Sequence, residues 1–305
     1  MPPRARRART MRDVRIAIVS THATNTNLRL AAAAPRGTRS FVVAPDDALR
    51  ELDFRDAALG RLDVRPTLDG IEQGLAQLAA LEERGVAMLN APLALQLAHD
   101  KLATASALTA AALPHPRTRA VDDADAPSPL PFPLVLKPRY GSWGRDVVLC
   151  ADEAAYRNAF STLRARAWFA ASGALAQELV RPLAHDLRLV VAAGDVIGAV
   201  KRVAAPGEWR TNVALGATRH PVDPSPAACE LAIAAAAAIG ADLVGVDLLP
   251  VGPGRYVVLE LNGAVDFSPV YAPGADVFEL VMSALVSRLR TEPVLPLEPI
   301  EALGA

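Results

Sequence analysis

The sequence has few of the features that mark exported, membrane or nucleic-acid-binding proteins. Its 305 residues contain only two cysteines, Cys150 and Cys229, which lie far apart and outside any CxxC motif. With no export signal, a disulfide framework is not expected, and both thiols are predicted to be buried small side chains in a reducing cytoplasm. No uninterrupted apolar run is long enough to span a bilayer. The formal net charge of −1 gives no electrostatic basis for nucleic acid or membrane as the main partner.

Basic residues are concentrated at the start of the chain, in "MPPRARRART". We expect residues 1–12 to be a disordered basic tail, or the product of an upstream start codon with Met11 as the true first residue. A targeting or nucleic-acid-binding arm is disfavoured because no apolar core of about 7 to 15 residues follows.

The apolar pattern predicts alternating strands and helices in the first third of the chain. "VRIAIVS" (14–20) and "SFVVAP" (40–45) are typical of buried strands. Between them a helix is expected to begin at Asn25 or Asn27, and residues 70–85 predict a second helix that ends at Gly85. Strand, helix and strand at this spacing indicate a small parallel sheet.

A change of pattern follows residue 92. One helical stretch (93–113) ends at Pro114 and Pro116, and the strand "LVLK" (134–137) comes after a loop rich in Asp and Pro. From Arg188 onward, short strands and turns predict an antiparallel sheet with helices on one side, an α+β arrangement.

Two acidic residues near the C-terminus are predicted to face each other. A hairpin that closes symmetrically about Pro253 and Gly254 places Asp247 opposite Glu260. Opposed like charges among valine and leucine destabilise a sheet, so a cation is expected between them. Asn262 lies on the same face as Glu260, because side chains alternate along a strand. These oxygen ligands suit Mg²⁺ or Mn²⁺ better than Zn²⁺, and the alternative is a pair of strand-end acids in salt bridges.

A lysine and a glycine-rich turn in "LVLKPRYGSWGRDVV" suggest a phosphate site. Lys137 ends a strand, and Gly141 and Gly144 allow backbone N–H groups to approach a phosphate closely. The chain contains no GxxxxGK[ST] loop, and a plain hairpin turn explains these glycines equally well.

An ordered set of motifs resembles the ATP-grasp ligases. The set comprises "AHDKLATASALTAAALPHPRT", "KPRYGSWGRDVV", "QELV", "HDLRLVVAAGDVIGAVKR", "RTNVALGA" and "VGVDLL...LELN". Over residues 14–290 the chain is most similar to the LysX/ArgX group of the RimK-related branch, which attaches an amino acid to a carrier-protein glutamate. The glycine loop favours LysX over RimK itself.

The resemblance implies a three-domain ATP-grasp architecture, α/β and α+β. The expected divisions are an N-terminal α/β domain (13–92), a central lid domain (93–178), a C-terminal domain (179–291) and a tail (292–305). It also implies ATP and two Mg²⁺ or Mn²⁺ as cofactors, an amino-acid substrate, a small acidic carrier protein or peptide as partner, a cytoplasmic location, and a homodimer or homotetramer.

The resemblance also assigns roles to individual residues. The implied nucleotide-binding residues are Lys101, Lys137, Gly141, Ser142, Trp143, Gly144, Gln177, Glu178, Leu179, Val180, Asp186 and Arg188. The implied catalytic residues are Arg202, Lys137 and Arg210, and the implied metal ligands are Asp247, Glu260 and Asn262. The implied substrate-binding residues are Arg145, Asn212, Leu215, Gly216, Gly263 and Asp266. Of five scattered histidines, His185, beside the hinge, is the best placed for a role.

Two segments depart from the family pattern. "NVALGA" stands where relatives have N-x-x-R-G-G, so Leu215 replaces an arginine and Ala217 a glycine; this leaves open a changed substrate, or replacement by Arg210 or Arg219. "NGAVDF" stands where the lysine-pathway relatives have "NHTMEF", so acceptor specificity is expected to differ.

Two classes of function remain open at this point. One is an active ligase that joins an amino-acid amine to a glutamate-type carboxylate through an acylphosphate, with a RimK-like glutamate ligase or a small-molecule dipeptide ligase as variants. The other is a weakened nucleotide-binding homologue that acts as a scaffold. The joint presence of the lysines, Arg202 and the opposed carboxylates favours the ligase.

Overall fold

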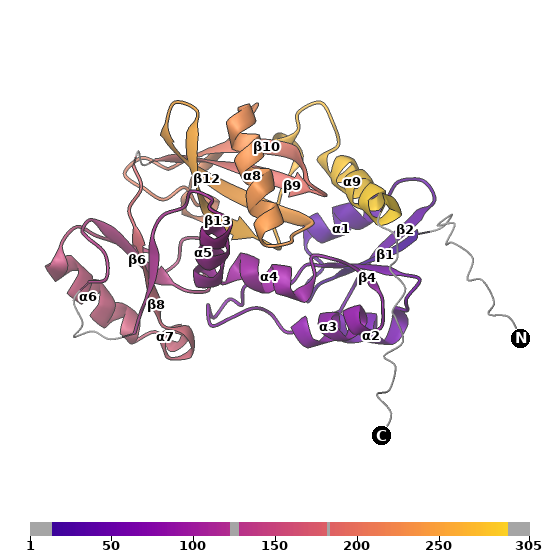
Figure 1. The fold of residues 1–305 in the computed structure, drawn as a ribbon, viewed down its shortest axis with the longest axis horizontal. Helices are drawn as coiled ribbons and strands as arrows, with labels where there is room; N and C mark the ends of the chain where they lie inside the picture. The colour runs from indigo at the N-terminus through magenta and orange to yellow at the C-terminus, as the bar shows by residue number, and fades with distance from the viewer. Residues whose placement is uncertain (1–13, 123–127, 182–183, 292–305) are drawn as a thin grey trace, which may run out of the picture.

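The computed structural model describes residues 14–122, 128–181 and 184–291, which form three sheets and the helices that cover them. Figure 1 shows the N-terminal sheet at the right, the central sheet at the left, and the C-terminal sheet between and above them. The predicted tails, residues 1–12 and 292–305, lie outside the described residues.

The N-terminal sheet is parallel, as the alternating pattern predicted. Its strands β1 (Val14–Val19), β2 (Thr38–Val43), β3 (Ala57–Gly60) and β4 (Ala87–Leu89) pair in the order β2-β1-β3-β4. The helices are α1 (Asn25–Ala32), α2 (Pro45–Glu51) and α3 (Leu75–Glu83). The Thr24 side chain accepts a hydrogen bond from the Asn27 amide and so fixes the start of α1. The second predicted helix starts later than residue 70, because Gly74 has a φ of 130°.

A single helix was predicted over residues 93–113, but Asp100 divides it in two. The helices are α4 (Pro92–His99) and α5 (Lys101–Ala110). Asp100 has extended backbone geometry, and its carboxylate accepts hydrogen bonds from the amides of Leu102 and Ala103 at the start of α5. Ala98 and Leu108 pack in the C-terminal core, so these helices, placed with the lid at the sequence level, lie against the C-terminal sheet.

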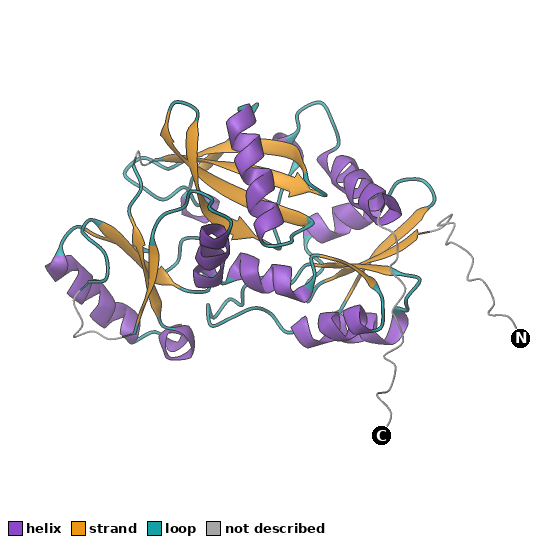
Figure 2. Ribbon diagram, viewed as in Figure 1, coloured by secondary structure: helices purple, strands orange, loops and turns teal. Residues whose placement is uncertain are grey.

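The central sheet is antiparallel, with strand order β5-β8-β6-β7. Its strands are β5 (Thr118–Val121), β6 (Leu134–Pro138), β7 (Val148–Cys150) and β8 (Ala174–Glu178). The helices α6 (Glu153–Arg164) and α7 (Ala167–Ser172) supply the aromatic side chains of its core, including Tyr156, Phe160 and Trp168. In Figure 2, α6 lies on the side of the sheet that faces away from the rest of the molecule, and α7 lies at the lower end of the sheet.

The C-terminal sheet is antiparallel and carries most of the residues discussed below. Its strands β9 (His185–Ala192), β10 (Asp195–Val203), β11 (Thr218–Pro221), β12 (Leu243–Gly252) and β13 (Arg255–Asn262) pair in the order β11-β10-β9-β12-β13. Two 3₁₀ turns, η1 (Val213–Leu215) and η2 (Pro269–Tyr271), border it.

Helices cover both faces of this sheet, so the expectation of helices on one side was wrong. Leu189 and Val191 of β9 pack against α8 (Pro226–Ala238), whereas Val190 and Ala192 pack against α9 (Val277–Thr291). The residues of β9 that precede this apolar stretch on the α9 face are Asp186 and Arg188, because side chains two apart share a face. The uncovered end of that face therefore carries charge.

Asn90 joins the N-terminal sheet to the C-terminal sheet. Its side chain accepts hydrogen bonds from the amides of Asp242 (2.8 Å) and Leu243 (2.9 Å), and donates to the carbonyl oxygens of Leu243 (2.7 Å) and Gly263 (3.2 Å). Asn90 is fully buried and has a φ of 50°, a conformation that asparagine tolerates better than most residues. The start of β12 and the end of β13 are thereby fixed against β4.

Both cysteines are free, as expected, but only Cys150 is buried; Cys229 is half-buried. Among the helices of the described residues, none combines the length and apolar character that a bilayer crossing requires.

Candidate active site

The β12–β13 hairpin confirms the predicted pairing of Asp247 with Glu260. The residues between the turn and Asp247, however, do not pair as they would in a symmetric hairpin. Pro250 pairs with Tyr256 and Leu248 with Val258, one residue out of step with the turn, and a second irregularity between Asp247 and Leu248 restores the register. Bulges of this kind bend strands and redirect side chains beside functional sites.

The cation predicted beside Asp247 is supplied by the chain. Arg188 donates to both carboxylate oxygens at 2.6 Å, and Arg202 donates to Oδ2 at 2.7 Å. Arg202 also forms an ion pair with Asp186, which is fully buried and accepts a hydrogen bond from Thr211.

Burial and the neighbouring arginines shift the pKa values of Asp247 and Asp186 in opposite directions. Burial alone would raise the pKa of Asp247, but Arg188 and Arg202 outweigh it and hold that pKa below its usual value. Burial prevails at Asp186 and raises its pKa, although Arg202 opposes the shift. The pKa of Arg202 is raised by the two carboxylates, against the effect of its own burial.

Two lysines from different elements approach Glu260 and the glycine loop (residues 141–147). Lys101, at the start of α5, lies 3.1 Å from Oε1 of Glu260 and donates to the Gly141 carbonyl at 2.7 Å. Lys137, at the end of β6, is 6% exposed and donates to Oε1 of Gln177 at 2.7 Å. Burial, assisted by Lys101, lowers the pKa of Lys137 from 10.5 to about 8. No carboxylate pairs with Lys137 in the described part of the chain, so its charge remains available to an anion.

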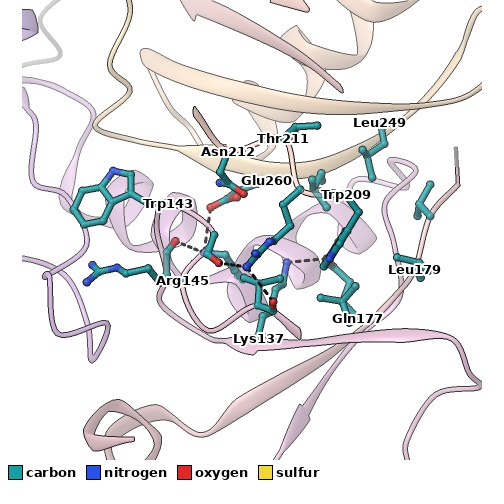
Figure 3. A pocket seen from close by; sticks show the side chains of 18 of the residues that line it. Lys137, Trp143, Arg145, Gln177, Leu179, Trp209, Thr211, Asn212, Leu249 and Glu260 are labelled. Atoms are coloured by element: carbon teal, nitrogen blue, oxygen red, sulfur yellow. Dashed lines mark hydrogen bonds and ion pairs between the residues drawn. The ribbon is translucent and has the colours of Figure 1, made fainter. Parts of the chain in front are cut away.

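A first cavity lies between the central sheet and the β12–β13 hairpin. Its empty volume, which includes the space at its open mouth, is about 880 Å³ and lies within the usual range for small-molecule sites. The hinge segment (residues 177–180), Lys101, Lys137 and the glycine loop line it. Figure 3 shows Trp143 and Arg145 at one end of this cavity, and Leu179 and Leu249 at the other. A flat apolar end and a cationic centre suit a nucleotide, with its base between the aliphatic side chains and its phosphates near the lysines.

The glycine loop is held to the segment before β11. Gly144 has a φ of 70°, and a Cβ there would lie 2.6 Å from Oδ1 of Asn212, so only glycine fits. Arg210 donates to the carbonyl oxygens of Gly144 (2.9 Å) and Val147 (3.4 Å) and forms an ion pair with Glu208. The guanidinium of Arg145 stacks over the ring of Trp143 at 4.7 Å, and this indole is 48% exposed.

A second cavity adjoins the first and holds about 720 Å³ of empty space. Four residues line both cavities: Ser142, Trp143, Asn212 and Glu260. The walls of the second cavity are more polar, and they carry Arg188, Arg202, Arg219, Asn262, Asp63 and Asp266. The two cavities thus meet at Glu260.

The structure brings most of the residues implied by the resemblance to these two cavities, and it places some elsewhere. Lys101, Lys137, Gly141 to Arg145, the hinge segment and Arg210 line the first cavity. Arg188, assigned at the sequence level to the nucleotide, lines the second cavity instead. The remaining implied residues that line neither cavity are Asp186, Asp247, Leu215, Gly216 and Gly263. His185 does line the first cavity, and burial lowers its pKa.

Sequence reasoning missed three contributors. Trp209 and Thr211 of the segment before β11 line the first cavity, and Asp63 lines the second. Asp63 follows the carboxyl end of the parallel strand β3, where ligand sites of α/β sheets lie, so the strand pattern could have indicated it. Trp209 carried no comparable signal.

The oxygen ligands around Glu260 fit a hard divalent cation. The Glu260 side chain is 22% exposed and, among the described residues, forms an ion pair with Lys101 alone; Asn262 lines the same cavity as Glu260. Asp247 lies opposite but has both oxygens in hydrogen bonds to arginine. Among the described residues no group of three or more His, Cys, Asp or Glu could hold a metal, so a cation here would take further ligands from water or phosphate.

Comparison with known proteins agrees with this geometry. Residues 98–277 match the family model described as the RimK-like ATP-grasp domain. A glutamate–LysW ligase ArgX from Sulfurisphaera tokodaii is 30% identical over 69% of this chain and 76% of its own length. A probable alpha-L-glutamate ligase from Aeromonas salmonicida is 32% identical over 75% of this chain and 76% of its own. The crystal structure of a RimK domain ATP-grasp protein from Sphaerobacter thermophilus has a TM-score of 0.64 at 23% identity, covering 90% of this chain and 100% of that one.

The arrangement of three sheets, with two lysines lining a cavity, agrees with the ATP-grasp fold of the solved structure. The curated relative ArgX is named as a ligase. The chain belongs to the RimK-like ATP-grasp family. It is an ATP-dependent ligase that forms carbon–nitrogen bonds, and ligases of this fold use ATP with divalent metal ions.

Proposed function

We propose that this ligase joins the amine of an amino acid to a glutamate-type carboxylate on a small acidic carrier protein or peptide. The observation that carries the proposal is the contact between the two cavities at Glu260, Asn212 and Ser142. One cavity suits ATP, and the other, charged and open, suits the groups to be joined. The relative that acts on LysW supports a carrier as the acceptor.

The residues of the first cavity have defined tasks in this scheme. The hinge segment holds adenine and ribose, while Lys101 and Lys137 neutralise the phosphates. Two Mg²⁺ or Mn²⁺ ions, held by Glu260, Asn262 and Asp247, would stabilise the charge on the phosphates when bound. The glycine loop, anchored by Arg210, covers the site and excludes water.

The reaction proceeds in two steps. An oxygen of the acceptor carboxylate attacks the γ-phosphorus of ATP, and ADP leaves with the electrons of the broken bond. The free amine then attacks the acylphosphate carbon, inorganic phosphate leaves, and the amine loses a proton. Arg202 and Arg188, on the wall of the second cavity, stabilise the negative charge that develops on the transferred group.

Incubation with ATP, Mg²⁺ and a pool of amino acids tests the proposal, with and without acidic peptides that end in glutamate. We expect ADP and phosphate release to rise with the peptide, and the peptide mass to increase by one amino-acid residue. Release of ADP and phosphate without stimulation by any acceptor would contradict a ligase role and favour a scaffold. Stimulation by free amino acids alone would indicate a dipeptide ligase, and serial addition of glutamate a RimK-like activity.

Assembly and location belong to the same proposal. We expect a homodimer or homotetramer, which light scattering on the purified protein would test. A cytoplasmic site of action fits an enzyme that depends on ATP and on free amino acids.

A further inference from the structure

The second cavity contains three arginines, and their partners differ. Arg188 and Arg202 are committed to Asp247 and Asp186 by hydrogen bonds within the chain. Arg219 lines the same cavity, and its side chain makes no hydrogen bond or ion pair with the other residues that the structure describes. Of the three arginines, it is therefore the one whose charge is not already shared with a carboxylate of the described chain.

The geometry around Arg219 leaves a buried donor without an acceptor. Arg219 pairs in register with Arg202 on β10, so the two side chains leave the sheet on the same face. Its Nε is buried and has no hydrogen-bond partner. A buried donor that stays unpaired is costly, and a guanidinium binds carboxylates well through two parallel hydrogen bonds. An anionic ligand would satisfy this group.

A second unpaired donor lies close by. The side chain of Tyr271 is 2% exposed, and its hydroxyl has no hydrogen-bond partner. Burial raises the pKa of this hydroxyl, while the charges of Arg188, Arg219 and Arg202 act on it in the opposite direction. The hydroxyl therefore keeps its proton at neutral pH; it lies within electrostatic reach of Arg219, although Tyr271 is not among the residues that line the second cavity.

The turn that carries Tyr271 is fixed against β10. A Cβ on Gly198 would lie 2.4 Å from the carbonyl oxygen of Tyr271, so the glycine permits this close approach. The backbone that carries the Tyr271 side chain is thus fixed against β10.

The structure also separates the two arginines that could replace the family arginine missing at position 215. Leu215 packs against the glycine loop, since a Cβ on Gly144 would lie 2.9 Å from its Cδ1. Arg210 donates to Glu208, Gly144 and Val147 and lines the first cavity. Arg219 is unpaired and lines the second cavity.

We propose that Arg219 and the Tyr271 hydroxyl form a carboxylate-binding subsite that holds the α-carboxylate of the amino acid whose amine attacks the acylphosphate. The subsite rests on the proposed ligase function. Asp63 and Asp266, also on the walls of the second cavity, supply negative charge for the ammonium end of the same molecule. The ligand is therefore a zwitterionic amino acid and not a simple amine.

Binding measurements with a matched pair of variants test the subsite. Arg219→Ala removes a charge on the cavity side of the β10–β11 ladder. Lys201→Ala removes a charge from the same ladder, but Lys201 pairs with His220 and so projects from the opposite face. Each of the twenty standard L-amino acids is titrated against the full-length protein with Mg²⁺ and a non-hydrolysable ATP analogue. The amino acid that binds most tightly is then compared with its α-amide.

We expect Arg219→Ala to weaken the binding of the amino acid about 10- to 100-fold, since a charged hydrogen-bonded pair is lost. Lys201→Ala should leave binding within twofold, and Tyr271→Phe should weaken it less than Arg219→Ala does. The α-amide should bind the wild type as weakly as the amino acid binds Arg219→Ala, with no further loss when the two changes are combined.

Three results would overturn the subsite: no amino acid binds, Arg219→Ala binds as tightly as the wild type, or the wild type does not distinguish the acid from its α-amide. The last comparison needs no variant, so it decides the matter even if Arg219→Ala does not fold. Amino-acid binding through Arg219 without any amide product would refute the ligase and leave the subsite intact. Amide formation by the wild type, together with unchanged amino-acid binding by Arg219→Ala, would refute the subsite and leave the proposed function intact.

Discussion

Lys137 should destabilise the ligand-free protein, and replacing it with methionine should reveal by how much. The lysine is buried, donates to Gln177 at 2.7 Å and has no carboxylate partner in the described residues. Methionine has a similar length, no charge and enough flexibility to fill the same space. Lys137→Met therefore removes the desolvated charge and leaves Oε1 of Gln177 without its donor.

The pKa of Lys137 sets the size of the effect. Burial lowers that pKa from 10.5 to about 8, and a difference of about 2.5 units corresponds to about 3 kcal/mol. Below pH 8 the folded and unfolded chains both hold the proton, so the full penalty is present. Between pH 8 and pH 10.5 the unfolded chain binds more protons than the folded one, so the stability of the wild type rises with pH.

The loss of the hydrogen bond to Gln177 lowers the stability of the variant by about 1 kcal/mol. Lys137→Met should therefore be more stable than the wild type by about 2 kcal/mol at pH 7, which raises Tm by about 3 °C for a protein of this size. The two stabilities should cross near about pH 9.5, and above pH 10.5 the variant should be the less stable protein.

Thermal unfolding of both proteins from pH 7 to pH 11, without nucleotide, measures this difference. Lys201→Met, on a lysine that lines neither cavity, controls for the loss of a lysine charge. A Lys137→Met protein that is less stable than the wild type at pH 7, or a difference that does not shrink above pH 8, would refute the reasoning. In addition, Mg²⁺ and ATP should raise the Tm of the wild type and not that of the variant, since the phosphates lose their buried cation.

Further predictions concern the carboxylates, the inter-domain contact and the glycine loop. Asp247→Ala or Glu260→Ala should each abolish turnover in the phosphate-release assay, and an active double variant would disprove the metal assignment. Asp247→Ala should also cost about 3 to 5 kcal/mol of stability in denaturant unfolding, because it leaves Arg188 without its carboxylate and removes one of the two carboxylates of Arg202, whereas Glu260→Ala should fold normally. Asn90→Ala should lower the free energy of unfolding by about 3 kcal/mol or more. Asn90→Gly loses the same side-chain hydrogen bonds but tolerates the left-handed backbone, so the difference between the two variants measures the backbone strain. Arg210→Ala should raise KM for ATP about tenfold and expose the glycine loop to proteolysis; an unchanged cleavage rate would show that Arg210 does not anchor Gly144.

Local patterns in the sequence were sufficient for the strands and for the key pairing. Apolar runs of strand length predicted the parallel N-terminal sheet, and the turn at Pro253 and Gly254 predicted the pairing of Asp247 with Glu260. The pairing held although two bulges lie between the turn and Asp247, because their offsets cancel. The prediction from a symmetric turn did not include those bulges.

Helix boundaries and helix placement were less predictable. Asp100 divides the predicted helix because its carboxylate caps α5 and binds Arg139, which directly follows β6 of the central sheet. Alanine-rich helices such as α8 carry little amphipathic signal, so the sequence did not indicate which face of the sheet each helix covers.

By itself, the sequence determined the class of the protein through the resemblance of its ordered motifs to the ATP-grasp ligases, since the order and spacing of motifs can be read along the chain without knowing what each side chain contacts. The tertiary structure decided what each charge faces. Only the packed sheets show that Arg188 and Arg202 are committed to Asp247 and Asp186 and that Arg210 is bound to the glycine loop. They also show that Arg219 and Tyr271 are left with unpaired donors. The partners of a charged side chain come from strands far apart in the chain, so their identity depends on which strands pair and in what register.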